Sequence, residues 1–173
     1  MVEGVLMSRM HDVLRRFRGA PNVRRADNPF RLVSSVSSAA GPGEIDAAWH
    51  PREIPDEVTS MWCAARSARL FEDADYGQWG LVILDPQASR LRTDAERLAR
   101  PRDFRDDDII LGEFLGDQEL LVVAPSESGI RRVLVALPLD PRSDWPGAAK
   151  DLAAFLDDYF DAGGNKYWEG GPV

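Results

Sequence analysis

Few side chains in this 173-residue chain could take part in bond-breaking chemistry, and they are far apart in the sequence. The two histidines are His11 and His50, so a Ser–His–Asp or Cys–His arrangement would have to use one of them. The single cysteine, Cys63, lies in an apolar stretch, which favours an inert, half-buried thiol over a nucleophile. One cysteine and two distant histidines do not supply the ligands of a zinc site. The sequence therefore predicts a protein that is not an enzyme.

Two groups of carboxylates are the remaining candidates for chemistry. Glu72, Asp73 and Asp75 fall in one turn, and Asp106–Asp108 precede an apolar run. Such groups could bind a divalent cation or act as paired acids and bases. Neither group has the alternating oxygen spacing of a calcium loop, and adjacent aspartates in a charged loop are usually solvated. A hydrolase that uses the Asp-rich turns is therefore the third hypothesis, behind two in which the chain binds proteins.

Aromatic residues in the same turns suggest recognition instead of catalysis. Tyr76 and Trp79 are interleaved with the carboxylates. An aromatic ring supplies contact area and a carboxylate supplies charge complementarity, as at the anchor of a protein interface. The predicted partner-binding residues are Glu72, Asp73, Asp75, Tyr76, Trp79, Asp117, Asp144 and Trp145. The alternative is that Tyr76 and Trp79 fold inward and cover the sheet.

The net charge of −8 is unevenly distributed along the chain. Residues 1–33 carry seven basic and three acidic side chains, whereas residues 106–173 carry five basic and fourteen acidic ones. Phosphate binding requires clustered Lys and Arg, so this acidic C-terminal region argues against nucleic acid as the partner. It favours encounter with a basic protein surface, with solubility as the alternative explanation.

The sequence also indicates where the protein is found. No apolar run approaches the ~20 residues that span a bilayer, and Arg15, Arg16 and Arg18 follow the first apolar residues, unlike the basic residues of a signal peptide. A single cysteine excludes an internal disulfide, which makes a reducing cytoplasm the default expectation. We therefore expect a cytoplasmic protein that has no membrane span.

The N-terminal part is predicted as an extension of the main domain. Apolar residues at helical spacing from Val2 to Phe17 indicate an amphipathic helix, which Gly19 and Pro21 end. Its arginines would suit an anionic membrane surface, but packing onto its own domain is the more common arrangement. The small-residue stretch Ser34–Gly43 is predicted as a linker. The domains are thus expected at residues 1–33, 34–43 (linker) and 44–173.

The main domain is predicted to be α+β, with one mainly antiparallel sheet packed with helices. Pro55 suits the first turn of a helix, and the last helix is expected after an N-cap at Asp144, with Gly163 as its stop. Short turns between strands require antiparallel pairing; one contains Gly116 and Asp117, and a second contains Ser128 and Gly129. A surface helix in residues 86–105 is predicted from apolar residues at helical spacing, namely Leu91, Ala95, Leu98 and Ala99. The expected strands are Leu81–Leu84, Ile109–Leu115, Glu119–Ala124 and Arg132–Leu137.

This order of elements resembles the SUKH superfamily, the Smi/Knr-type domains. The resemblance runs from about Glu44 to Trp168. It rests on the segments IPDEVTSMWCAA, RLFEDADYGQWGLVIL, IILGEFLGDQELLVVA, RRVLVALPL and GAAKDLAAFLDDYF. The chain departs from the family in having Ala65–Arg66–Ser67 where an Asn–Gly pair is common, and its basic N-terminal helix lies outside the usual core.

The resemblance implies a mixed sheet carried on helices, with no cofactor and no catalytic set. Family members look like bacterial immunity proteins that neutralise toxins, or like regulatory scaffolds such as those linked to fungal cell-wall synthesis. The high content of Arg, Ala and Asp fits a GC-rich bacterial genome and favours the first role. We therefore expect an immunity protein that blocks a basic toxin domain by stoichiometric occlusion. A SUKH-type regulatory adaptor is the alternative.

Overall fold

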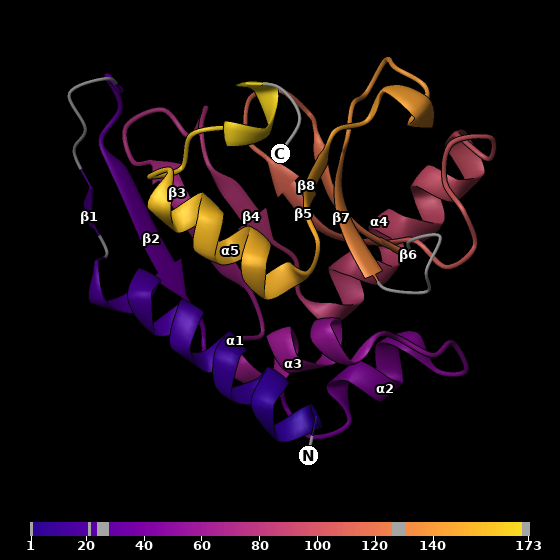
Figure 1. Ribbon diagram of the computed structural model, residues 1–173. Helices are drawn as coiled ribbons and strands as arrows, with labels where there is room; N and C mark the ends of the chain where they lie inside the picture. Colours follow the sequence, from indigo (N-terminus) through magenta and orange to yellow (C-terminus); the bar gives the residue numbers. More distant parts are fainter. Residues whose placement is uncertain (1, 21, 24–27, 126–130, 171–173) are drawn as a thin grey trace.

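The computed structural model describes residues 2–20, 22–23, 28–125 and 131–170. The strands in these residues form one sheet whose spatial order follows the sequence from β1 to β8 (Figure 1). Each neighbouring pair among them is antiparallel, whereas the resemblance implies a mixed sheet. The predicted α+β class with a mainly antiparallel sheet is confirmed. The strands are β1 (Asn22–Val23), β2 (Leu32–Val36), β3 (Ala68–Asp73), β4 (Leu81–Ile83), β5 (Ile109–Phe114), β6 (Leu120–Pro125), β7 (Arg131–Ala136) and β8 (Gly147–Ala149).

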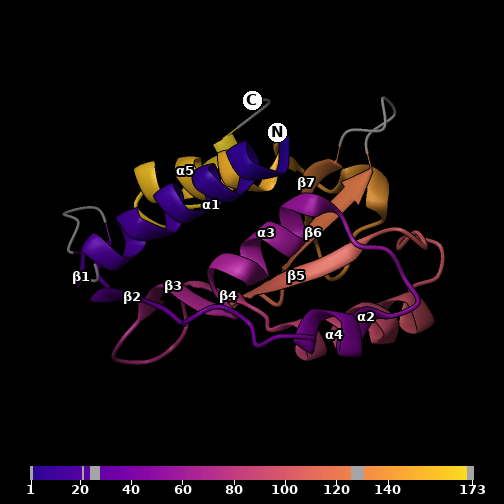
Figure 2. The ribbon, with the colours of Figure 1, turned by 90° about the horizontal axis from the view of Figure 1, so that it is seen from below.

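Helices cover both faces of the sheet. Figure 2 shows α1 (Val2–Gly19), α3 (Asp56–Ala64) and α5 (Leu152–Asp161) on one face. The short α2 (Glu44–Trp49) and the longer α4 (Pro86–Ala99) lie toward the other face. Two single-turn 3₁₀ helices are also present: Arg142–Asp144 precedes β8, and Tyr167–Gly170 follows α5. Within the described segments, none of the helices combines the length and apolarity that a bilayer crossing requires.

The N-terminal helix α1 packs on its own domain, the more common of the arrangements that the sequence leaves open. Its apolar side, which includes Met10, Leu14 and Phe17, is buried in the main hydrophobic core. Two of its arginines bind α5: Arg9 lies 3.2 Å from Asp151, and Arg16 lies 2.8 Å from Asp157. These arginines therefore hold two helices together and are not free for a membrane surface.

The predicted linker begins too early, because residues 34–36 belong to β2. Strands β2 and β3 change register between Val33 and Ser35, where β3 has an additional residue. Phe71 at this bulge has a φ of 50°, a left-handed conformation that is rare for a bulky residue. Its backbone N–H donates to the buried hydroxyl of Ser34 at 2.9 Å. The small Ser34 thus satisfies a donor that the bulge leaves unpaired.

The last helix also begins later than predicted. Asp144 lies in the first 3₁₀ helix, Ala148 lies in β8, and α5 starts at Leu152. Asp151 is the actual N-cap: its carboxylate accepts from the backbone N–H of Ala154 at 2.7 Å. Glu57, on α3, accepts from the N–H of Leu152 at 2.8 Å, so a second helix helps to cap α5.

Strand β4 and the meander from β5 to β7 confirm the predicted strands to within a residue or two. Leu81, Ile83 and the apolar residues of β5 and β6 are buried, as expected of strands covered on both faces. The turn at Gly116 is present, with a φ of 96° at that residue. The second predicted turn, at Ser128 and Gly129, lies outside the described residues.

A smaller core lies on the other face of β5, β6 and β7. It contains Phe104, Ile110, Val122, Leu134 and Trp145. The rings of Phe104 and Trp145 are 4.9 Å apart between centroids. Trp145 is therefore a core residue on this face of the sheet.

Candidate protein-binding site

The turn between β3 and β4 is organised by Asp73. This carboxylate is 2% exposed and accepts from the backbone N–H groups of Asp75 at 3.0 Å and Gln78 at 3.4 Å. The backbone of Asp73 adds two bonds, donating to the carbonyl of Trp79 and accepting from the N–H of Gly77. Asp73 therefore fixes the shape of the turn and does not offer its carboxylate to a partner.

Tyr76 lies on this fixed turn and is 77% exposed. Its neighbour Asp75 is half-exposed and lies 3.1 Å from the guanidinium of Arg31. The carbonyl of Arg31 also accepts from the N–H of Ala74 at 2.9 Å. Several bonds thus hold the backbone that presents Tyr76, while the ring itself points to solvent.

Trp79 turns inward, which is the alternative that the sequence left open for both aromatic residues. Its indole N–H donates to the carbonyl of Gly164 at 3.0 Å. Its ring stacks on Phe30 with 6.3 Å between centroids. Glu72 is also engaged, because Arg69 donates to both of its oxygens at 2.7 Å. These bonds from Arg69 hold the pKa of the Glu72 carboxyl below its usual value.

Lys166 is a site residue that the sequence reasoning missed. Its side chain is 8% exposed and lies 2.7 Å from Glu119, with a second ion pair to Asp117. Its ammonium group is 5.8 Å from the ring centroids of Trp79 and Phe114. Burial acts to lower the pKa of Lys166, but its hydrogen bonds to Asp117 and Glu119 hold that pKa above its usual value. The sequence signal that could have identified Lys166 is that it is one of only five basic residues in the acidic region 106–173.

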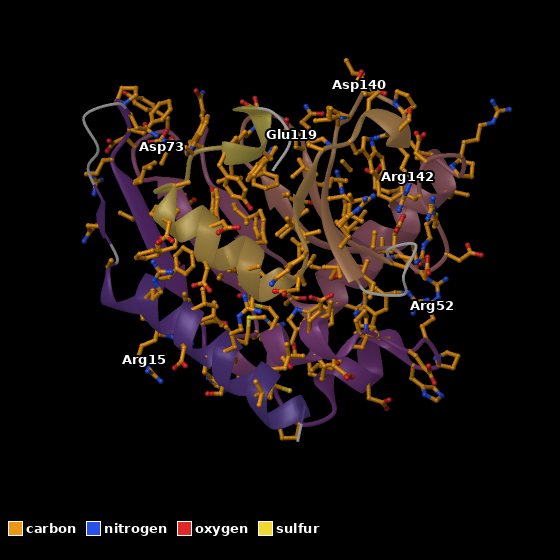
Figure 3. All side chains as sticks on the ribbon, in the orientation of Figure 1. Arg15, Arg52, Asp73, Glu119, Asp140 and Arg142 are labelled. Atoms are coloured by element: carbon orange, nitrogen blue, oxygen red, sulfur yellow. The ribbon has the colours of Figure 1, made fainter. Side chains whose placement is uncertain are left out.

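These contacts bring three segments together, which we call the turn edge: residues 74–80, residues 115–119 and residues 164–169. The bonds from Trp79 to Gly164 and from Lys166 to Asp117 connect them, and the N–H of Leu115 donates to the carbonyl of Gly80 at 2.8 Å. Figure 3 shows Asp73 and Glu119 along the same end of the sheet. The turn edge therefore contains four of the predicted residues, Asp75, Tyr76, Trp79 and Asp117, and Asp73 directly precedes its first segment.

Asp144 and Trp145 do not join the turn edge. Trp145 is 6% exposed, and its indole N–H donates to the carbonyl of Asp140 at 3.1 Å. Asp144 is exposed beside it. Figure 3 places Asp140 and Arg142 well away from Asp73. The predicted binding residues are thus divided between two places on the molecule.

The aspartates of residues 106–108 have a structural role through Asp108. Its carboxylate is fully buried and is bound by Arg142 at 2.5 and 2.9 Å, one nitrogen to each oxygen. It also accepts from the backbone N–H of Arg105 at 2.8 Å. Within the described residues, no three His, Cys, Asp or Glu side chains are grouped so that they could hold a metal ion. The geometry thus gives Asp108 an ion pair that stabilises a loop.

Cys63 is exposed, so the prediction of a half-buried thiol is wrong. It lies on the outer side of α3, which buries Val58, Met61 and Trp62 on its other side. Cys63 and His50 both line an open depression of about 730 Å³ beside α2 and α3. The second histidine, His11, is exposed on α1.

No protein-family model matches this chain, and a search of the curated proteins returns no match.

Proposed function

We propose that this chain is a SUKH-like, non-enzymatic binding protein and that it acts in the cytoplasm as an immunity protein. In this role it would occlude a cognate toxin domain by forming a stoichiometric complex. The observation that carries the proposal is Tyr76, an aromatic side chain that is 77% exposed on a turn held by the buried carboxylate of Asp73. A rigidly presented aromatic ring is a typical anchor of protein interfaces, because little conformational entropy is lost on binding.

The charges of the molecule support a basic partner. Asp75 and Asp117 lie on the turn edge together with Tyr76, and both are about half-exposed although they have intramolecular partners. The net charge of −8 would attract a basic protein over a longer range. Tyr76 then supplies the short-range contact, and the surrounding carboxylates determine which surfaces are accepted.

A regulatory adaptor with the same fold is the second candidate, because the same turn edge could hold a different protein. The hydrolase hypothesis has less support, since the carboxylate of Asp108 is bound by Arg142 and Arg105. The identity of the captured partner separates the first two candidates. A toxin domain supports the immunity role, and proteins of wall synthesis or signalling support the adaptor.

The experiment is affinity capture from source cells with the tagged protein, followed by elution with salt and mass spectrometry. We expect one stoichiometric, basic, toxin-like partner. Tyr76→Ala should weaken the complex at least about tenfold, the usual loss at an interface anchor. Val5→Ala is the matched control, because Val5 is 68% exposed on α1, away from the turn edge. Equal binding by Tyr76→Ala and the unmodified protein would contradict the proposed site, and suppression of toxicity on co-expression would complete the test of function.

A further inference from the structure

Helix α4 turns its apolar side away from the protein. Leu91 and Leu98 are 61% and 86% exposed, and Ala95 and Ala99 are exposed beside them. Residues four, seven and eight positions apart lie on one side of a helix, so these four form a continuous row, which we call the α4 stripe. The sequence pattern alone predicts that such a stripe faces the core.

The orientation of α4 is fixed by hydrogen bonds on its opposite side. Ser89 and Thr93 are fully buried there. The hydroxyl of Ser89 donates to the carbonyl of Ile110 at 2.6 Å, and the N–H of Ile110 donates to the hydroxyl of Thr93 at 3.0 Å. Rotating the helix to bury its leucines would leave these groups of β5 unsatisfied. The α4 stripe is therefore exposed in the folded monomer, on the layer opposite α1 and α5 (Figure 2).

The charged residues beside the α4 stripe are complementary to those of a second, antiparallel copy of the same helix. Arg92 follows Leu91, and Glu96 lies two positions before Leu98. An antiparallel pair that places Leu91 opposite the partner's Leu98 also places Arg92 beside the partner's Glu96. By symmetry each such contact occurs twice.

An ion-pair network is already present along this side of the helix. Arg92 lies 3.3 Å from Glu96 and 3.3 Å from Glu113 of its own chain. The carboxylate of a second copy would extend this network at the rim of the apolar contact. Apolar residues in the centre with paired charges at the rim are the usual composition of a helix–helix interface.

We propose that the chain forms a symmetric homodimer through the α4 stripe, with the two α4 helices antiparallel. This interface uses different residues from the turn edge, so both copies keep Tyr76 free. The dimer would present two binding sites to its partners. The inference does not rest on the proposed function, because it would hold equally for an immunity protein or an adaptor.

Sedimentation velocity of the full chain from about 1 to 100 µM, a range that covers a modest association constant, tests the proposal. We expect the mass to rise from monomer toward dimer with concentration. Leu98→Glu should weaken association at least about tenfold, because it places a charge in the apolar contact. Val5→Glu, which alters another exposed aliphatic residue, on α1, should associate as the unmodified chain does. A monomer at every concentration, or unchanged dimerisation of Leu98→Glu, would overturn the proposal.

Cross-linking tests the antiparallel arrangement. Ala95 lies near the expected two-fold axis, so Ala95→Cys should form a disulfide between two copies under mild oxidation. The exposed Cys63 is first replaced by Ser in all variants. Val5→Cys in the same background should cross-link much more slowly. Equal cross-linking at the two positions would show that α4 is not the interface.

Discussion

The ion pair between Asp108 and Arg142 should be the most sensitive polar contact beside the smaller core, where Arg142 lies over the ring of Trp145. Asp108 is fully buried, and the side chain of Arg142 is 16% exposed. Replacing Asp108 by Ala leaves the Arg142 guanidinium without its carboxylate and the N–H of Arg105 without its acceptor. Removing one partner of a buried ion pair destabilises proteins by about 3–5 kcal/mol. For a domain of this size, that loss corresponds to a melting temperature lower by roughly 6–20 °C.

The assay is thermal unfolding followed by circular dichroism, with Asp106→Ala as the matched control. Asp106 is exposed, and its side chain makes no hydrogen bond or ion pair within the described residues, so its loss should leave the melting temperature unchanged. A double variant, Asp108→Leu with Arg142→Met, removes both charges and should recover part of the stability. Equal melting temperatures of Asp108→Ala and Asp106→Ala would refute the structural role of Asp108.

Two further predictions concern the core and the pH dependence of stability. Gly164→Ala should destabilise the protein by about 1–3 kcal/mol in urea unfolding. The added Cβ would lie 2.5 Å from the Cβ of Phe71, and the φ of Gly164 is +82°. Gly4→Ala is the control and should not destabilise the protein, because its added Cβ would meet no atom within 4 Å. The hydrogen bonds from Arg69 lower the pKa of Glu72 in the folded protein. The contribution of this ion pair to the free energy of unfolding is therefore complete well above the usual pKa of 4.5 and is lost as the pH falls below that value. Arg69→Gln should reduce the loss of stability between pH 5 and 3 in urea titrations, and an unchanged pH dependence would contradict this assignment.

Local sequence patterns predict the central elements of the fold because those elements are determined by neighbouring residues. The buried strands β4 to β7 are apolar runs bounded by turn residues or, between β4 and β5, by helix α4, and such runs have few alternatives in a folded chain. The amphipathic pattern of α1 likewise predicts its length but not the surface on which it packs. Strands β1, β2, β3 and β8 are not predicted. Small and polar residues such as Ser34 and Gly147 give β2 and β8 no strand signal of their own. Pairing with β3 and β7 makes these segments strands.

The candidate site could be predicted only in part, because its contacts join residues far apart in the chain. The sequence identifies an aromatic, acidic turn from Glu72 to Trp79, but it does not show that Glu72 and Asp73 belong to β3, that Asp73 is buried or that Tyr76 is exposed. Lys166 reaches Asp117 across 49 positions, and no local pattern relates the two. The sequence by itself thus determines the α+β class, the meander and the uneven charge, since these depend on local periodicity and composition. The tertiary structure alone decides which side of α4 is exposed, because the Ser89 hydroxyl donates to β5 and the Thr93 hydroxyl accepts from it, and these bonds keep the leucines of α4 away from the core.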